Sequence, residues 1–414
     1  MNPTFTTAIR YFVDVTCQAP LRTGSSKRSM EIILKNADDI PMLQGTSLAG
    51  SFRSWRKDAK LFGSQDEKSS LMFSDLIFQP VMPVIRPRVK INGKTGTIES
   101  SSKFDVAALP KGTTGSFQMI WTGNTDPEAM APQLEAYLSA LHSGEIVLGA
   151  LKANGFGRVT LHVKRRMYRM TNPEDLEAWL LDDQVTDAQE IPLQVHTEKY
   201  VLFKVNATMP ELLVKSASDD RSKGGGHSIP MKENGTYFLP SSSLKGSIRG
   251  QMARICPLLN RSPMELEQLF GHANRQKQGG LAGVLRFSDG SLEKADSHQT
   301  NRIRINRLTG GVMYKSLLAA NPVTAELSFE IRVPVQREAG CGLLLYALRD
   351  LGLGLYELGS GTAIGWGRAV KMTVEIQSPK GNATLSCHNQ NMDLSDPDGL
   401  VAAWQKKLEG GASL

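Results

Sequence analysis

The sequence is poor in cysteine and lacks long apolar runs, and both absences narrow the range of functions open to the chain. Its four cysteines are scattered at Cys17, Cys256, Cys341 and Cys387 and form no C-x-x-C pair. Such a pair is typical of a zinc site or a redox motif, so we expect buried free thiols in a reducing compartment. No apolar run approaches the roughly 20 residues of a membrane span. The first ten residues have neither the basic start nor the apolar core of a signal peptide. These features predict a cytoplasmic protein without a membrane partner.

The glycine-rich motifs of nucleotide-binding enzymes are also missing. The chain has two Gly-x-Gly-Arg segments, but in each the second glycine is followed by arginine and a strand-like run. Rossmann and Walker motifs instead open a helix and carry further glycines or a Lys-Ser/Thr pair. The net charge of +7 is compatible with a polyanionic partner but does not identify one.

What the chain does contain is one series of motifs, present twice in the same order. Each series has a Ser-Leu-x-Gly-Ser-x-Arg block, a Leu-Phe-Gly, a Phe-Ser-Asp, a basic block ending in Thr-Gly, and a Leu-Gly followed by Gly-x-Gly-Arg. In the first series they begin at Ser47, Leu61, Phe73, Arg88 and Leu148, and in the second at Ser243, Leu269, Phe287, Arg302 and Leu358. Chance does not explain five matches in one order, so the chain is a tandem duplication. An acidic, weakly patterned stretch at 181–192 places the domains at residues 1–185 and 186–414.

Each half is predicted to run in the order strand, helix, β-arm, strand, helix, strand, helix. The alternation of apolar residues predicts opening strands at residues 9–16 and 200–207 and closing strands at 159–163 and 369–376. Strands are also expected at 116–121 and 325–333, as the second strands of the arms, with helices at 132–141 and 342–351. Asn172-Pro173 and Asp396-Pro397 predict one more helix start in each half. Residues 377–393 resemble a loose connector.

The Ser-Leu-x-Gly-Ser-x-Arg block predicts a helix start that binds an anion. Its serines suit an N-cap or the first turn, and free amides at a helix N-terminus attract phosphate. The alternative is simple capping combined with close helix packing at Gly50 and Gly246. The residues expected to contact RNA here are Ser47, Arg53, Ser243, Lys245 and Arg249.

The Gly-x-Gly-Arg segments predict a second anion-binding element. Two glycines allow a tight turn whose amides approach an anion, and arginine can form a fork onto a phosphate. The alternative is a turn with a solvated arginine. The residues concerned are Gly155, Gly157, Arg158, Gly365, Gly367 and Arg368.

The basic blocks predict a β-arm with a positively charged stem. Strand alternation would place Arg302 and Arg304 on one face, where they suit contact with a nucleic-acid backbone. The alternative is a solvated β-ribbon. The arm residues expected to bind RNA are Arg88, Lys90, Arg302, Arg304 and Arg307.

Together these motifs resemble the RAMP superfamily of CRISPR-associated proteins. The Arg-Ile-Arg-Ile-Asn-Arg-Leu-Thr-Gly segment at residues 302–310 is similar to the arm of type III backbone subunits, which usually has Asp-Arg where this chain has Asn306-Arg307. The whole chain resembles a backbone subunit with two fused domains, as in type III-D-like effector complexes. The resemblance implies a ferredoxin-like, RNA-recognition-motif fold in each half, an α+β architecture. It also implies binding along a guide RNA, a thumb-like arm that interrupts guide–target pairing, and other CRISPR effector subunits as partners.

Some members of this superfamily cut target RNA with a metal-dependent aspartate in the loop before the first helix. In this chain the carboxylates of those two loops are Glu31, Asp38 and Asp39 in the first half and Asp219 and Asp220 in the second. Carboxylates can hold a hard divalent cation such as Mg²⁺ for phosphodiester cleavage. Solvated acidic residues are the alternative, and so is His227 as a general base.

Three functions therefore remain open from the sequence. The first is a guide-RNA-binding backbone subunit that cleaves target RNA in one or both loops. The second is the same scaffold without chemistry, which binds RNA and assembles the complex. The third, a guide-processing endoribonuclease, would need a well-placed catalytic histidine.

Overall fold

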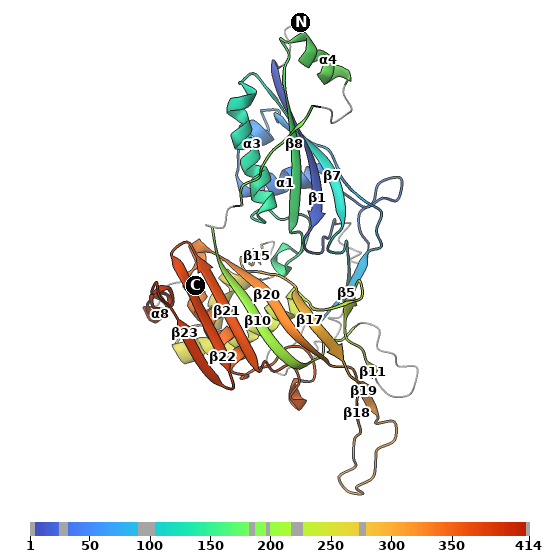
Figure 1. Cartoon of the computed structure of the whole chain (residues 1–414), viewed down its shortest axis with the longest axis vertical. Coiled ribbons are helices and arrows are strands. Elements are labelled where there is room, and N and C mark those ends of the chain that lie inside the picture. The colour runs from blue at the N-terminus through green and yellow to red at the C-terminus, as the bar shows by residue number, and fades with distance from the viewer. Residues whose placement is uncertain are drawn as a thin grey trace. The chain divides into compact units, whose positions relative to one another are not determined.

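The protein is seen in a computed structural model that describes residues 5–24, 32–89, 104–181, 187–195, 199–216, 227–272 and 279–410. It consists of two compact units (Figure 1). Residues up to 197 form most of the first unit. Residues from 198 onward form the second, together with residues 153–155. The strand at residues 189–190 pairs within the first sheet, beyond residue 185. The domain border proposed from the repeat stays a prediction.

The first unit is an antiparallel sheet packed against helices. Its strands are β1 (Thr7–Cys17), β2 (Met42–Leu43), β3 (Leu71–Phe73), β4 (Leu76–Phe78), β5 (Val84–Arg88), β6 (Phe104–Ala108), β7 (Thr114–Gly123), β8 (Val159–Arg169) and β9 (Gln189–Glu190). Its helices are α1 (Gly45–Trp55), α2 (Ala59–Phe62), α3 (Pro127–His142) and α4 (Pro173–Leu181). The central strand order β4-β7-β1-β8 is antiparallel throughout. With α1 after β1 and α3 after β7, this is the ferredoxin-like arrangement.

The second unit repeats that arrangement on a larger sheet. Its strands are β10 (Tyr200–Leu212), β11 (His227–Ser228), β12 (Lys232–Glu233), β13 (Thr236–Leu239), β14 (Gly271–His272), β15 (Leu281–Ala282), β16 (Arg286–Phe287), β17 (Gly290–Ser297), β18 (Thr300–Arg302), β19 (Leu318–Ala320), β20 (Val323–Pro334), β21 (Lys371–Ser378), β22 (Gly381–His388) and β23 (Asn391–Ser395). Its helices are α5 (Ser241–Ile255), α6 (Glu267–Phe270), α7 (Ala339–Gly352) and α8 (Leu400–Glu409). The order β17-β20-β10-β21 matches that of the first unit. The predicted α+β fold with two tandem ferredoxin-like domains is confirmed.

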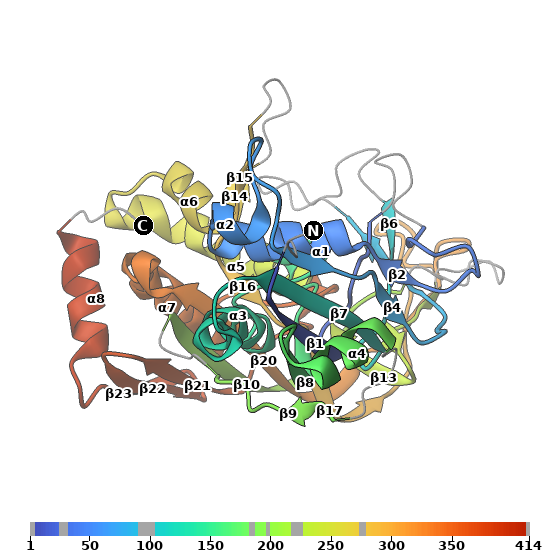
Figure 2. The same cartoon turned by 90° about the horizontal axis from the view of Figure 1, so that it is seen from above.

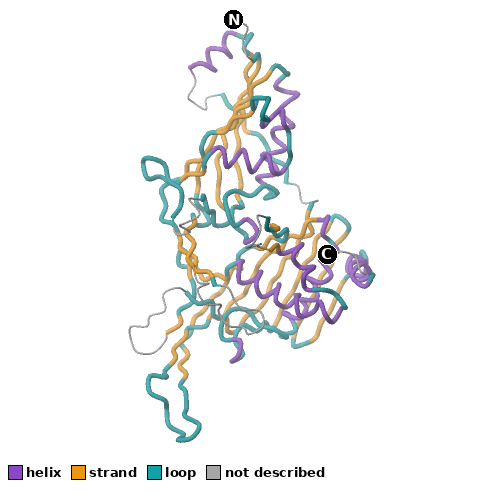
Figure 3. Tube along the Cα trace, turned by 180° about the vertical axis from the view of Figure 1, so that it is seen from behind, coloured by secondary structure: helices purple, strands orange, loops and turns teal. Residues whose placement is uncertain are grey.

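The apolar pattern of the sequence explains how each unit is built. In β1 the buried residues alternate along the strand, as its sequence alternates. Leu48 and Phe52 of α1 are fully buried, four residues apart on one helix face. In the second unit Leu244, Ile248 and Met252 form the same stripe on α5. In the first unit α1 and α3 cover one face of the sheet (Figure 3), and in the second unit α5, α7 and α8 lie on the same side of the sheet (Figure 2).

Two predictions at the C-terminal end are wrong. Residues 377–393 are not a loose connector, because β22 and β23 extend the second sheet as a meander from β21. The last helix does not begin at Pro397 but at Leu400, after Gly399 takes a left-handed φ of 66°. Asp396 nevertheless caps it, since its carboxylate accepts from the N–H groups of Val401 and Ala402 at 3.0 and 3.1 Å.

Each unit also carries a β-arm, and its return strand differs from the prediction. β5 pairs with β6 in the first unit, and β18 pairs with β19 in the second. The runs at 116–121 and 325–333 are strands as predicted, but they belong to the central β7 and β20. They were mistaken for arm strands because they are the next long alternating runs. The second arm closes with a turn in which Asn306 accepts from Gly310 and donates to Gly311.

The cysteines behave as the sequence predicts. All four are free and buried. Burial raises the pKa of the Cys17 thiol to about 12 and that of the Cys341 thiol well above its usual value. They are therefore protonated and unreactive. In the described part of the chain, no helix is both long and apolar enough to cross a membrane.

Candidate nucleic-acid interface

The first helix of each unit begins at a carboxylate from a distant motif. The Asp75 Oδ1 atom accepts from the Gly45 N–H at 2.7 Å, and the Asp289 Oδ1 atom accepts from the Ser241 N–H at 2.8 Å. A negative side chain is favourable at the positive end of a helix. This contact explains why Phe-Ser-Asp is repeated. It also means that the first amide of each helix already has an anionic partner, while anion binding by the amides that follow stays a prediction.

The serines of the same block lie in the first turn and do not cap the helix. Ser47 and Ser243 are the third residues of α1 and α5, and neither helix start has a side-chain cap from its own N-cap residue. Ser47 is exposed and Ser243 half-buried. Of the two roles that the sequence left open, the first-turn position is the observed one.

On the first helix of each unit, an exposed glycine and an exposed arginine follow these serines, Gly50 with Arg53 and Gly246 with Arg249. We call this surface the bare strip. Gly50 and Gly246 are exposed, and a Cβ atom added to either would meet no atom within 4 Å. Close helix packing therefore does not explain them. Glycine inside a helix costs about 1 kcal/mol relative to alanine. Arg53 and Arg249 follow three residues later, are exposed, and share the strip because residues three apart are neighbours on a helix.

The Leu-Phe-Gly block supports Arg249. The guanidinium carbon of Arg249 lies 5.8 Å from the ring centroid of Phe270, which is buried. Gly271 ends α6 with a φ of 76°, as Gly63 ends α2 with a φ of 75°. The glycine of this block is thus a helix terminator, and in the second unit its aromatic residue lies beneath the arginine.

The Gly-x-Gly loops use their amides internally. In the second unit Gly365, Trp366 and Gly367 donate their N–H groups to carbonyls of Thr362, Gly361 and Glu211. In the first unit Gly157 donates to the carbonyl of Pro20 at 2.9 Å. These four amides already have acceptors within the protein, so they do not form the anion site by themselves. A binding role of the loop depends on its side chains.

The arginines after the loops differ in exposure. Arg368 is exposed, and its side chain lies across Gly354, where an added Cβ would come within 2.2 Å of the arginine Nε. Gly354 follows the C-terminus of α7, whose carbonyl end favours a cation. Arg158 is half-buried, and its carbonyl accepts from Gln18 and Ala19.

Lys245 is engaged within the second unit. Its Nζ donates to the carbonyl of Ala153 at 3.0 Å, and the Oγ of Ser241 donates to the carbonyl of Asn154. Residues 153–155 belong to this unit, and Gly155 has a φ of 76°. Lys245 therefore holds a main-chain segment, and its contact with RNA stays a prediction.

The arm arginines fall into two groups. Arg302, at the root of the second arm, is half-buried and lies over the ring of Trp366, at 4.6 Å from its centroid. In the first unit Arg88 lies over Phe156 at 5.9 Å. Farther along the second arm, Arg304 and Arg307 are exposed. Lys90 lies outside the described residues.

The aromatic residue of each Gly-x-Gly loop is part of the site and was not predicted from the sequence. Phe156 and Trp366 are buried to 3% and 4% exposure, beneath the arm arginines. The signal was present, because the variable position between the two glycines is aromatic in both copies.

Two of the predicted catalytic carboxylates, Asp38 and Asp39, are described by the structure, and both lie in a turn. Asp39, at a φ of 62°, pairs with Lys35 at 2.7 Å, and Asp38 receives a hydrogen bond from the Asn36 side chain at 3.5 Å. Glu31, Asp219 and Asp220 lie outside the described residues. Within the described ranges, no three His, Cys, Asp or Glu side chains gather into a metal-binding group. The metal site therefore stays a prediction.

His227 lies at the base of the second arm. It is in β11, which pairs with β19, and its Nε2 hydrogen bonds with the Asn321 side chain at 2.7 Å. This contact gives His227 a structural role beside the arm. It does not supply the catalytic arrangement that guide processing would need.

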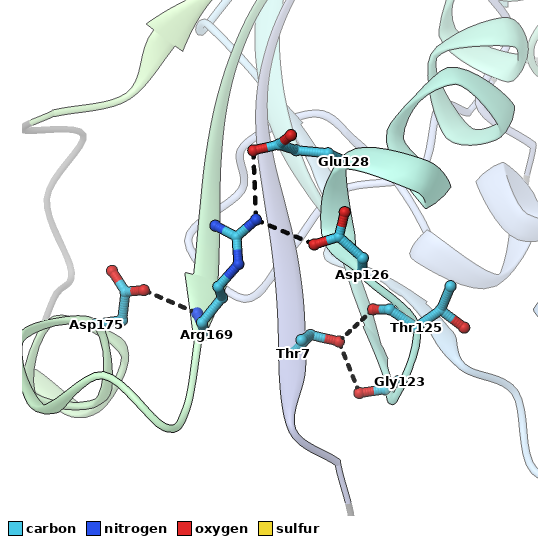
Figure 4. Close-up of polar contacts among 7 residues, drawn as sticks. All are labelled: Thr7, Gly123, Thr125, Asp126, Glu128, Arg169 and Asp175. Carbon is cyan, nitrogen blue, oxygen red and sulfur yellow. Dashed lines mark hydrogen bonds and ion pairs between the residues drawn. The ribbon is translucent and has the colours of Figure 1, made fainter.

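One end of the first unit does not fit RNA. Arg169 is bound by Asp126 at 3.0 Å and Glu128 at 3.3 Å, and its N–H donates to Asp175 of α4 (Figure 4). The hydrogen bonds to Glu128 and Asp126 raise the pKa of Arg169. Since Arg169 already faces three carboxylates, it is a poor candidate for a phosphate contact. The exposed Arg53 of α1 is the better candidate in this unit.

Comparison with known proteins agrees with this geometry. A family model of the RAMP superfamily matches residues 14–160 and 224–371, one match in each repeat. No curated protein matches the chain. The two matches cover more than half of the chain, and each contains an exposed arginine strip and an arm. The chain therefore belongs to the RAMP superfamily, whose members are generally CRISPR-associated RNA-binding proteins.

Proposed function

We propose that this chain is the guide-RNA-binding backbone subunit of a CRISPR type III effector complex, with two fused domains that hold one guide RNA. Its further partners are target RNA and the other effector subunits. The observation that carries this proposal is the bare strip of helix with an exposed arginine, present in both units. Gly50 and Gly246 weaken their helices without allowing any packing, so a ligand that approaches the helix backbone accounts for them.

The second arm supports the backbone role. It leaves the sheet as a long hairpin (Figure 1), with Leu308 exposed to 95% and Tyr314 to 89%. Exposed apolar side chains beside Arg304 and Arg307 suit insertion between bases combined with phosphate contact. In our proposal this arm interrupts guide–target pairing.

RNA binding is tested by removing the arginines of both strips. The double variant Arg53→Ala/Arg249→Ala is expected to bind single-stranded RNA about tenfold more weakly, because two phosphate contacts are lost. The slope of log affinity against log salt should fall by about 1 to 2. Electrophoretic shift assays at several salt concentrations measure both quantities. Arg254→Ala is the matched control, because Arg254 is exposed on α5 but is not part of the repeat. Equal binding by the double variant and wild type would contradict the proposal.

Target-RNA cleavage in the loops before α1 and α5 is a further part of the proposal. We expect that Asp219→Ala/Asp220→Ala abolishes Mg²⁺-dependent cleavage by the assembled complex and leaves RNA binding unchanged. Asp38→Ala/Asp39→Ala is expected to change cleavage little, because Asp39 is already paired with Lys35. Glu31→Ala completes the set, and EDTA serves as the metal-free control. Cleavage that persists in every variant would exclude these carboxylates. A complex that never cleaves would leave the non-catalytic scaffold.

A further inference from the structure

In both units, an arginine at the root of the arm lies on the aromatic residue between the two loop glycines. The Arg302 guanidinium carbon is 4.6 Å from the centroid of Trp366, and that of Arg88 is 5.9 Å from the centroid of Phe156. The two arginines occupy the same position of the repeat, and so do the two rings. Both copies of the repeat therefore contain this pair of an arginine and a ring, although the ring is Phe156 in one and Trp366 in the other.

The surroundings fix the ring of Trp366 in place. An added Cβ at Gly361 would come within 2.5 Å of the indole, so the backbone of Gly361 lies directly against it. The main-chain N–H of Trp366 donates to the Gly361 carbonyl at 3.2 Å. Trp366 also packs with Leu213 and with Ala320 of β19, the return strand of the arm. The ring is thus a rigid platform at the arm root.

We propose that each pair is a phosphodiester-binding site, in which the ring orients the guanidinium and the guanidinium binds one phosphate of the RNA backbone. This inference rests on the proposed function, since its ligand is RNA. A guanidinium stacked on an aromatic face has its plane fixed, and its N–H groups can then bind two phosphate oxygens at once. Lysine has no such plane.

The hydrogen bonding and exposure of Arg302 fit a cation that binds a ligand. Its Nε is buried and has no hydrogen-bond partner among the described residues. The side chain as a whole is only half-buried, so part of it remains accessible at the arm root. In the first unit Arg86 is a second cation over Phe156, at 5.6 Å. One ring there faces two arginines, which suits the same ligand.

The test compares charge-preserving variants of the full chain, with single-stranded RNA as the probe. Arg302→Lys and Trp366→Leu are each expected to weaken binding about tenfold, although neither changes the charge. Arg254→Lys, on α5 and outside the repeated block, should bind as wild type does. Trp366→Phe, the residue of the first unit, should also retain binding and controls for folding. The double variant Arg302→Lys/Trp366→Leu should bind no more weakly than either single variant, because the two residues act as one site.

The possible outcomes separate the two proposals. Wild-type protein that fails to bind RNA would overturn the proposed function and, with it, this site. Wild-type binding combined with unchanged binding by Arg302→Lys and Trp366→Leu would overturn only the site. Losses that add in the double variant would also overturn it, since the residues would then act independently. A loss in Trp366→Leu, retention in Trp366→Phe and non-additive losses are the supporting result.

Discussion

Gly246→Ala is expected to make the second unit more stable and the protein a poorer RNA binder. An alanine Cβ at this position of α5 meets no atom within 4 Å, so the change costs no packing. It should raise the free energy of unfolding by about 0.5–1 kcal/mol, because alanine loses less backbone entropy than glycine in a helix. The same methyl group would stand between the helix and a phosphate backbone. We expect affinity for RNA to fall about tenfold, or about 1.4 kcal/mol.

The control for this experiment lies one turn away. Gly250 is also exposed on α5, and a Cβ there also meets open space, but it is not part of the repeated block. Gly250→Ala should therefore stabilise the unit by a similar amount and leave RNA binding unchanged. Thermal unfolding and filter binding on both variants measure the two effects. If Gly246→Ala gains stability without losing affinity, the bare strip is not an RNA contact. Gly50→Ala tests the equivalent strip in the first unit.

The duplication and the ferredoxin-like core could be predicted from the sequence because both depend on local pattern. Alternating strands such as residues 9–16 and stripes such as Leu244, Ile248 and Met252 report their own environment. The ends of the elements were predicted less well, because they too were judged from local pattern alone. The prediction began α3 near Pro132, whereas the helix begins at Pro127, so that Pro132 lies inside it.

Contacts between distant residues could not be predicted in this way. Asp75 and Asp289 cap helices 30 and 48 residues earlier in the chain, and no local pattern reveals that pairing. The Gly-x-Gly amides were taken for an anion site because glycine is typical of both tight turns and anion-binding loops. Glu211 and Thr362 accept from these amides, which only the fold reveals. The strands at 377–393 were not predicted because β22 and β23 are partly polar.

The repeated residues therefore divide into two kinds. Phe-Ser-Asp, Leu-Phe-Gly and the loop glycines are kept by geometry: a cap, a helix terminator and a tight turn. The exposed arginines and the bare helix strip have no such explanation within the described chain. A repeated motif by itself does not distinguish a residue that supports the fold from one that contacts a ligand.

Gly367→Ala is expected to be among the most destabilising substitutions in the protein. Gly367 has a φ of 81°, and an added Cβ would lie 1.8 Å from the carbonyl oxygen of Leu358. That carbonyl belongs to a residue whose own N–H donates to the Gly367 carbonyl at 2.9 Å. The loop cannot move away without breaking this bond. We expect a loss of more than about 4 kcal/mol in the free energy of unfolding, measured by urea denaturation.

Two causes contribute to that loss: the left-handed backbone at Gly367 and its close approach to the Leu358 carbonyl. A variant at Gly365, two residues earlier, separates them. Its φ of 90° is equally unfavourable for alanine, but an added Cβ would meet nothing within 4 Å. Gly365→Ala should therefore show the conformational cost alone, about 1–2 kcal/mol. Similar losses in the two variants would contradict the close approach of Leu358 and Gly367. A large excess at Gly367 would mean that this glycine is required by the turn itself, without reference to a ligand. Gly246, whose added Cβ meets nothing within 4 Å, would then be the glycine to test for a ligand contact.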